Sequence, residues 1–287
     1  MLKQRIITAL ILAPLAILAI FYLPIPYFSA LLMAIVAIGA WEWTSFMGIQ
    51  RRIYRCFYSA STLVIIGLLW FFTPTVGAWS IKSAISFEIS TLLWLSTAWW
   101  LSAILLIFSY PRFNKLWATN SLIIGVLGWL VLIPTWLAFV FLRTNNYSLD
   151  QFHGAQLLMY LFMLVWSADI GAYFVGKSFG KNKLLPNVSP GKTIEGFLGG
   201  IFCALILTLL VGLLSDWSFA KSITALFVTL LITSVSVLGD LTESMFKRQA
   251  GVKDSGTLLP GHGGILDRID SLTATAPVFA LCYVLLA

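Results

Sequence analysis

Long uninterrupted runs of apolar residues constrain this chain more than any other feature of its sequence. A helix needs about 20 consecutive apolar residues to cross a bilayer, and runs of this kind recur from one end of the chain to the other. Only 10% of the 287 residues are charged, whereas soluble domains carry about a quarter. Because so few charges cannot cover a water-facing surface, we expect an integral membrane protein.

The apolar runs predict an all-α, polytopic fold with about nine transmembrane helices. Their expected bounds are 5–23, 27–46, 56–74, 89–109, 119–142, 155–176, 196–214, 220–246 and 264–287. No linker rich in glycine or serine divides the chain, so we expect a single membrane domain over residues 1–287. Residues 1–150 have little polar content within their spans and are interpreted mainly as scaffold. Residues 151–287 are expected to hold the catalytic helices and cytoplasmic loops.

The distribution of basic residues predicts the orientation of the helices, because cytoplasmic segments of membrane proteins are enriched in Lys and Arg. With a cytoplasmic N-terminus and nine alternating spans, only Lys82, Arg143 and Lys221 of the 18 basic residues fall on the outer side. We therefore expect the N-terminus in the cytoplasm and the C-terminus outside. The net charge of +7 is attributed to this asymmetry, and no nucleic acid partner is expected.

Several carboxylates fall within or at the ends of the predicted helices, where a charge is costly and usually marks a functional site. They are Glu42, Asp169, Asp240, Glu243, Asp267 and Asp270. At about 1.5 Å of rise per residue, the four aspartates are expected roughly 5–10 Å below the cytoplasmic surface. Their common depth indicates a polar chamber shared by three helices.

The spacing of these carboxylates favours a divalent metal ion. Asp267 and Asp270 are three residues apart and share one helix face, and Asp240 and Glu243 have the same spacing. Hard oxygen ligands at such spacing suit Mg²⁺, which keeps waters and bridges to substrate phosphates. Two other interpretations stay open here, namely ion pairs with Lys247 and nearby basic residues, and a path for protons or ions.

Two polar segments on the predicted cytoplasmic side, about 177–195 and 247–263, combine glycine and proline with basic residues. Flexible backbone and ammonium groups of this kind can bind phosphates. The Gly-Lys-Thr triplet at 191–193 resembles part of a P-loop, but Pro186 stands where the required glycine belongs. The second segment leads through a glycine-rich turn into the helix of Asp267, whose N-terminus favours phosphate. A charged phosphate substrate and a lipid co-substrate are therefore expected.

Two blocks of the sequence resemble the phosphatidate cytidylyltransferases, also called CDP-diacylglycerol synthases. The family signature is complete here and comprises Ser244, Lys247, Arg248, Lys253, Asp254, Pro260, His262, Gly263, Gly264, Asp267, Arg268 and Asp270. The earlier block resembles the family at Trp166, Asp169, Ala172, Tyr173, Gly176, Lys177, Ser189, Pro190, Gly191, Lys192, Thr193, Glu195 and Gly196. Together the blocks cover roughly a quarter of the chain.

The resemblance implies that phosphatidic acid and CTP react to give CDP-diacylglycerol and pyrophosphate, with Mg²⁺ as cofactor and K⁺ as a candidate second cation. It implies a metal site made by Asp240, Asp267 and Asp270. Expected catalytic residues are these three together with Lys247, Arg248, Lys253 and Arg268. Expected substrate-binding residues are Lys177, Ser189, Lys192, Asp169, Glu243, His262, Gly263 and Gly264.

Two alternative functions stay open: another membrane transferase acting on a lipid phosphate, and a cation- or proton-coupled transporter. Transporters commonly contain an inverted repeat, whereas the polar motifs here occur only in the second half of the chain. The Gly196-x-x-x-Gly200 motif would pack helices within the fold or between two subunits, so a homodimer is one option. Short loops suggest a bacterial inner membrane, with membrane lipids around the protein and the active site facing the cytoplasm.

Overall fold

A computed structural model describes residues 2–72, 87–114, 117–259, 261 and 263–286 of the chain, with side chains from residue 10 onward. Its helices are α1 (Leu2–Tyr22), α2 (Ile25–Trp43), α3 (Arg52–Phe72), α5 (Phe87–Ser109), α6 (Ser121–Thr144), α7 (His153–Phe179), α8 (Ile194–Leu214), α9 (Phe219–Ala250) and α10 (Leu266–Leu286). Between α7 and α8, the strands β1 (Lys183–Leu185) and β2 (Ser189–Thr193) form an antiparallel hairpin.

The all-α membrane fold predicted from the apolar runs is confirmed. In the described part of the chain, one helix corresponds to each predicted run, and eight of these helices are long and apolar enough to cross a membrane. The described apolar part of α1 is shorter, Leu10–Tyr22. Helix α9 runs four residues beyond its predicted end because it stops at Gly251, whose φ of 70° allows a left-handed C-cap.

The small hairpin was not predicted, because its five-residue second strand contains proline and glycine and shows no alternation of apolar and polar residues. In the structure Lys183 pairs with Thr193 and Leu185 with Ser189. Val188, in the turn, is 1% exposed. This buried turn residue holds the hairpin against the helices. The segment between α7 and α8 is therefore a packed β-hairpin and not an irregular loop.

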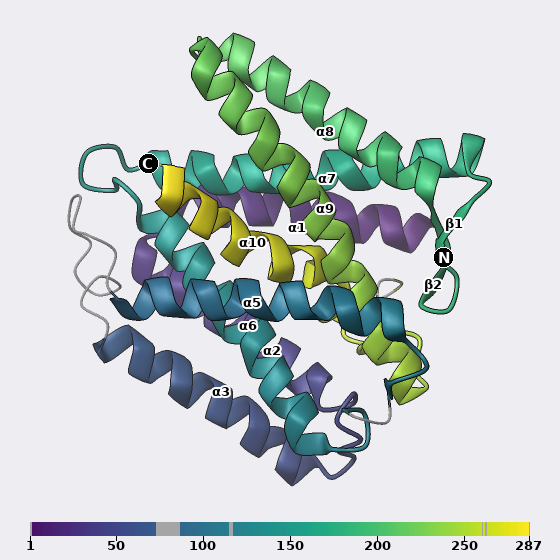
Figure 1. Cartoon of the computed structure of the whole chain (residues 1–287). Coiled ribbons are helices and arrows are strands. Elements are labelled where there is room, and N and C mark those ends of the chain that lie inside the picture. Colours follow the sequence, from purple (N-terminus) through teal and green to yellow (C-terminus); the bar gives the residue numbers. More distant parts are fainter. Residues whose placement is uncertain (1, 73–86, 115–116, 260, 262, 287) are drawn as a thin grey trace.

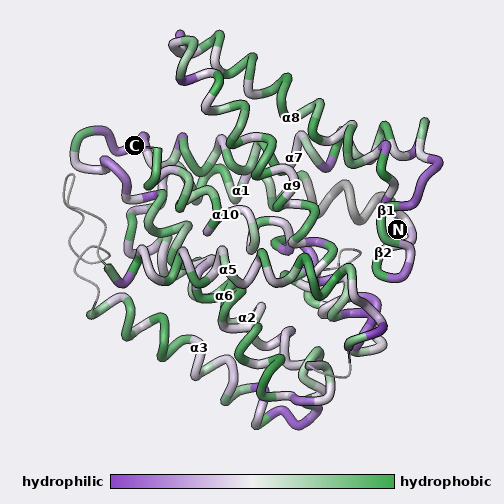
Figure 2. The backbone as a smooth tube through the Cα atoms, viewed as in Figure 1, coloured by the Kyte–Doolittle hydropathy of each residue, from purple (hydrophilic) through white to green (hydrophobic). Residues whose placement is uncertain are grey.

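Helices α6 and α10 form the centre of the bundle. Trp136 and Leu137 of α6 are fully buried, and α10 contacts α9, α6, α5, α7 and α2. Outer helices expose large apolar side chains instead, such as Leu213 and Phe227, as expected for surfaces that face lipid. Figure 2 shows hydrophobic residues along the helices and hydrophilic residues mainly at their ends and connections.

The two ends of the chain lie on opposite sides of the bundle (Figure 1). The beginning of α1 lies on the same side as the β1–β2 hairpin, whereas α10 ends on the other side. The hairpin and the beginning of α1 therefore lie on one side of the bundle. The nine spans predicted from the sequence would give such an arrangement.

Close contact between α7 and α8 depends on small residues. A Cβ at Gly200 would lie 2.6 Å from the Ala168 carbonyl oxygen, and one at Gly196 would lie 2.9 Å from the Ala172 carbonyl oxygen. The Gly-x-x-x-Gly motif therefore packs two helices of the same chain, as small residues commonly do in membranes. The homodimer stays a prediction, now without this motif as its basis.

The Gly200→Ala variant is expected to be less stable than the wild type, because its new methyl group would meet the backbone of α7. Overpacking of this kind costs about 1–3 kcal/mol. The matched control is Gly67→Ala in α3, where an added Cβ meets no heavy atom within 4 Å. Thermal unfolding in one detergent measures both, and equal melting temperatures would contradict the close packing of α7 on α8.

Candidate active site

Hydrogen bonds anchor the β1–β2 hairpin at both its base and its turn. At the base, Thr193 is the N-cap of α8, and Glu195 in the first turn of that helix accepts a hydrogen bond from the Asn182 side-chain amide at 2.8 Å. At the turn, Nε of Arg248 on α9 donates to the Val188 carbonyl oxygen at 3.3 Å. Arg248 was predicted to be catalytic, and the structure places it as a contact that holds the hairpin to α9.

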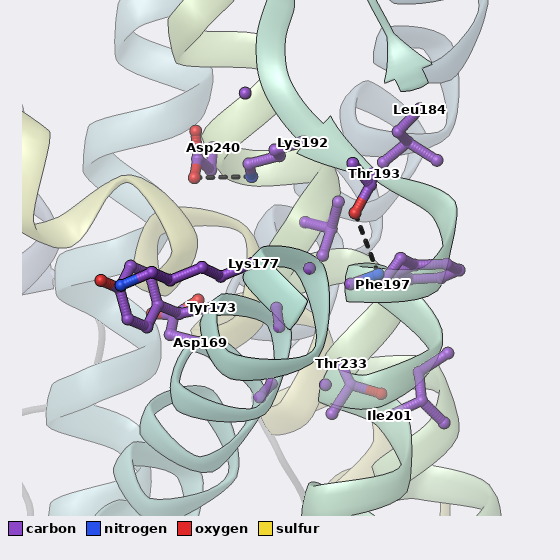
Figure 3. A pocket seen from close by; sticks show the side chains of 17 residues that line it. Asp169, Tyr173, Lys177, Leu184, Lys192, Thr193, Phe197, Ile201, Thr233 and Asp240 are labelled. Carbon is purple, nitrogen blue, oxygen red and sulfur yellow. Dashed lines mark hydrogen bonds and ion pairs between the residues drawn. The ribbon is translucent and has the colours of Figure 1, made fainter. Parts of the chain in front are cut away.

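The anchored hairpin brings Lys192 to α9. Its Nζ lies 2.6 Å from Oδ2 of Asp240, and both side chains are partly exposed (Figure 3). The other oxygen of Asp240 accepts a hydrogen bond from the Ser244 hydroxyl at 3.2 Å. This ion pair joins a predicted substrate-binding residue to a predicted catalytic residue that lies 48 positions further along the chain.

A cavity of about 400 Å³ lies between α7, α8, α9 and the hairpin. Its volume is in the range of small-molecule sites, roughly 300–1,000 Å³. It is lined by Ala168, Asp169, Ala172, Tyr173, Gly176, Lys177, Leu184, Gly191, Lys192, Thr193, Gly196, Phe197, Gly200, Ile201, Thr233, Val237 and Asp240. Figure 3 shows Asp240 and Lys192 at one end and Ile201 and Thr233 at the other. One cavity therefore offers charged groups and apolar surface together.

A second charged cluster lies where α9 meets α10. Nζ of Lys247 is 2.6 Å from Oδ1 of Asp267 and 3.2 Å from Oε1 of Glu243. Oδ2 of Asp267 accepts hydrogen bonds from the Ser255 N–H at 2.8 Å, the Ser255 hydroxyl at 2.9 Å and the Gly264 N–H at 2.8 Å. The ion pairs that the sequence left open as an alternative are thus formed by Lys247.

Asp270 of α10 lies near both clusters. It is within electrostatic range of Asp240 and Lys192 beside the cavity, and also of Lys247 in the second cluster. Asp169 on α7 is likewise within electrostatic range of Asp240 and Lys192. Carboxylates from α7, α9 and α10 therefore share one region with two lysines.

The chemistry of these donors suits Mg²⁺, which prefers carboxylate oxygens. Among the residues that the structure describes, however, no group of three or more His, Cys, Asp or Glu side chains is close enough to hold a metal ion. Lys192 neutralises Asp240, and Lys247 neutralises Asp267. Two of the three predicted metal ligands are thus ion-paired, and the metal site stays a prediction.

Further predicted residues lie around this centre. Nζ of Lys177 lies 5.7 Å from the centroid of the Tyr173 ring, which also lines the cavity. Lys253 and Arg268 are exposed and form no salt bridge within the described part of the chain. These three cations can meet an anionic ligand that arrives from water.

The remaining predicted residues belong to turns. Ser189 begins β2 at the hairpin turn. Gly263 has a φ of 80°, which favours glycine, and its carbonyl oxygen accepts a hydrogen bond from Leu259 N–H at 2.9 Å. His262 lies outside the described residues, as do Pro260 of the signature and the basic residues Lys82 and Lys115.

Two residues near Asp267 were not assigned a role from the sequence. Glu42 of α2 is 3% exposed and accepts a hydrogen bond from the Ser255 hydroxyl at 3.2 Å. The position of Glu42 inside an apolar span was a signal of importance, but it gave no partner. Ser255 gave no signal, because its partners are brought to it only by the fold.

Comparison with known proteins supports the resemblance seen in the two blocks. A sequence model of the Cytidylyltransferase family matches residues 3–286. A Haemophilus influenzae protein named phosphatidate cytidylyltransferase is 43% identical over 288 residues, which cover 99% of each chain. A Pseudomonas aeruginosa protein of the same name is 45% identical over 281 residues, covering 98% of this chain and 96% of the relative.

These matches extend far beyond the two blocks and run through the helices on both sides of them. Agreement over the full length, together with the charged cavity and the complete signature, confirms the resemblance. The chain belongs to the cytidylyltransferase family.

Proposed function

We propose that this chain transfers CMP from CTP to phosphatidic acid, giving CDP-diacylglycerol and pyrophosphate. The observation that supports this most is the cavity between α7, α8 and α9, which has the Lys192–Asp240 ion pair at one end, Ile201 and Thr233 at the other, and Lys177 and Asp169 in its lining. Such a site suits nucleotide phosphates and a lipid headgroup together. Both bacterial relatives described above are named for this activity, and their similarity to this chain extends over almost its whole length.

The reaction joins two polyanions. A phosphate oxygen of phosphatidic acid attacks the α-phosphorus of CTP and forms a new P–O bond. The bond from the α-phosphorus to the oxygen that bridges to the β-phosphorus breaks, and pyrophosphate leaves with the electron pair. Because the nucleophile is already an anion near neutral pH, the protein mainly has to position the reactants and neutralise charge.

The lysines of the site would supply much of that neutralisation. Lys192 and Lys177 line the cavity and would hold phosphates as point charges. Oδ2 of Asp240 lies 2.6 Å from Nζ of Lys192 and keeps this lysine beside the cavity. Arg268 and Lys253 are exposed near the second cluster and would attract CTP from the surrounding water.

Mg²⁺ is part of the proposal, with Asp240, Asp267 and Asp270 as its candidate ligands and K⁺ as a candidate second cation. Bound Mg²⁺ would neutralise phosphate charge and stabilise the leaving pyrophosphate. The hard oxygen donors on two adjacent helices support it. Because Lys192 and Lys247 neutralise two of these carboxylates in the structure, we expect the metal ion to compete with their ammonium groups.

The proposed location is a bacterial inner membrane, with the hairpin, the active site and the N-terminus facing the cytoplasm and the C-terminus outside. The placement of 15 of the 18 basic residues on one side of nine spans supports this orientation. The two relatives compared above are bacterial. CTP would then arrive from the cytoplasm, and phosphatidic acid from the surrounding lipid.

Purified protein mixed with phosphatidic acid, CTP and Mg²⁺ is expected to form CDP-diacylglycerol and pyrophosphate. Chelation of divalent ions should abolish turnover, and added Mg²⁺ should restore it. Other nucleoside triphosphates and a prenyl phosphate should react poorly; an equal rate with a prenyl phosphate would favour the other transferase. Cation flux in liposomes without CTP turnover would favour the transporter.

Loss of a site carboxylate should nearly abolish the reaction. Asp267→Asn and Asp270→Asn are each expected to lower the rate of CDP-lipid formation about 100-fold or more, because each removes a candidate ligand of the Mg²⁺ that would neutralise the phosphates. The matched control is Asp216→Asn, an exposed residue between α8 and α9 at the far end of the bundle. Near-normal turnover in both site variants, at equal expression, would reject these assignments.

The orientation can be tested with single cysteines introduced into a cysteine-free background. Asn187→Cys in the hairpin turn should react with an impermeant maleimide only after the cells are permeabilised. Leu149, 70% exposed in the wild type, belongs to the connection between α6 and α7, which lies across the bundle from the hairpin (Figure 1). Leu149→Cys should react in intact cells whose outer membrane is permeable to the reagent. The opposite labelling pattern would overturn the proposed topology.

A further inference from the structure

We propose that Glu42, a buried carboxylate of α2, is a positioning residue that holds the connection between α9 and α10 in its active arrangement. This inference rests on the proposed function and adds a residue from the half of the chain interpreted as scaffold. Glu42 lies outside both family-like blocks and does not line the cavity. It acts through the backbone around Asp267 and not on a substrate.

Both carboxylate oxygens of Glu42 bind the α9–α10 connection. Oε1 accepts a hydrogen bond from the Ile265 N–H at 3.0 Å, and Oε2 accepts one from the Leu266 N–H at 2.9 Å. These amides lie at the beginning of α10, where N–H groups have no partner within the helix. A carboxylate also interacts favourably with the positive end of a helix dipole. Glu42 therefore caps α10 from another helix.

The same carboxylate is linked to Asp267 through Ser255. The Ser255 hydroxyl lies 3.2 Å from Oε2 of Glu42 and 2.9 Å from Oδ2 of Asp267. Asp267 also accepts the N–H groups of Ser255 and Gly264, each at 2.8 Å. Glu42 and Asp267 thus hold one turn from two sides, and a shift of either carboxylate would move the other.

The connection is shaped to enclose the Glu42 side chain. A Cβ at Gly256 or at Gly264 would overlap the carboxylate of Glu42. A substituent at either position would push this backbone away from α2. The two glycines therefore allow the loop to close around the carboxylate at hydrogen-bonding distance.

Apolar contacts fix α2 independently of Glu42. The Trp43 and Phe246 rings lie 5.0 Å apart between centroids, which packs α2 against α9. Val36 and Ala40 of α2 are buried in the same core. Because α2 already has these contacts, a buried carboxylate is not needed to attach it to the bundle.

No salt bridge in the described part of the chain includes Glu42; the lysines that form salt bridges there pair with Asp240, Glu243 and Asp267. Arg55 of α3 interacts electrostatically with Glu42 without forming a salt bridge. Burying a charge that lacks a direct ion partner is costly. The hydrogen bonds to the connection offset this cost only while the loop keeps its shape. A polar group of this kind specifies one arrangement of its surroundings, and here that arrangement carries Asp267 and Asp270.

The test compares Glu42→Gln with two controls in the full-length protein. Glu88→Gln makes the same chemical change at the beginning of α5, on the far side from the hairpin. Val36→Ala removes buried volume from α2 and controls for a general loss of stability. Melting temperature, kcat and the KM for CTP are measured for each, with phosphatidic acid in mixed micelles.

The Glu42→Gln variant is expected to lose about 10–100-fold in kcat, the size of effect seen when groups that orient catalytic ligands are removed. The side-chain NH₂ group of the glutamine would face a backbone N–H group, where the wild type has a carboxylate oxygen that accepts its hydrogen bond. KM for CTP should change less, and both controls should keep kcat. Ser255→Ala combined with Glu42→Gln should lower kcat no further than Glu42→Gln alone, because both substitutions break one network.

A Glu42→Gln kcat equal to that of Glu88→Gln, or additive effects of Glu42→Gln and Ser255→Ala, would overturn the positioning role. If Glu42→Gln does not fold, Ser255→Ala alone decides, since it removes one hydroxyl and should still lower kcat at a normal melting temperature. An unchanged kcat in that variant would overturn the inference. Absence of CDP-lipid formation by the wild type would instead refute the proposed function itself.

Discussion

Carboxylates that lie below the surface of a membrane need partners from the protein, because the surrounding lipid offers none. Lys192 crosses from the hairpin to Asp240, and Lys247 bridges Glu243 and Asp267. These pairs connect α9 to β2 on one side and to α10 on the other. The arrangement of this end of the molecule therefore follows from the pairing of a few charged side chains, of which Lys192 and Asp240 are partly exposed.

The apolar core holds the helices in fixed positions relative to one another. Helices α6 and α10 are enclosed by the others, so the N-terminal end of α10 is presented at a defined place. Small residues let α7 and α8 approach closely, and the cavity lies between these helices, α9 and the hairpin. Its lining combines charged groups with apolar side chains, which would suit a water-soluble nucleotide and a membrane lipid together.

Division of the chain into a scaffold half and a catalytic half describes the distribution of motifs. It does not describe the hydrogen bonds around Asp267, which include a residue of the scaffold half. Glu42 of α2 binds the first amides of α10 and shares Ser255 with Asp267. The catalytic half thus depends on a carboxylate from the other half. Its depth inside a span was visible in the sequence, whereas its partners, more than 200 residues away, were not.

The sequence by itself determined the membrane-spanning helices, the family and the residue types of the site, because apolar length and local motifs are properties of contiguous segments. Only the tertiary structure decided that Lys192 pairs with Asp240, that Arg248 holds the hairpin and that Glu42 caps α10. Each of these contacts joins residues that lie far apart in the sequence. Their distances depend on how apolar surfaces pack, and no local spacing encodes that.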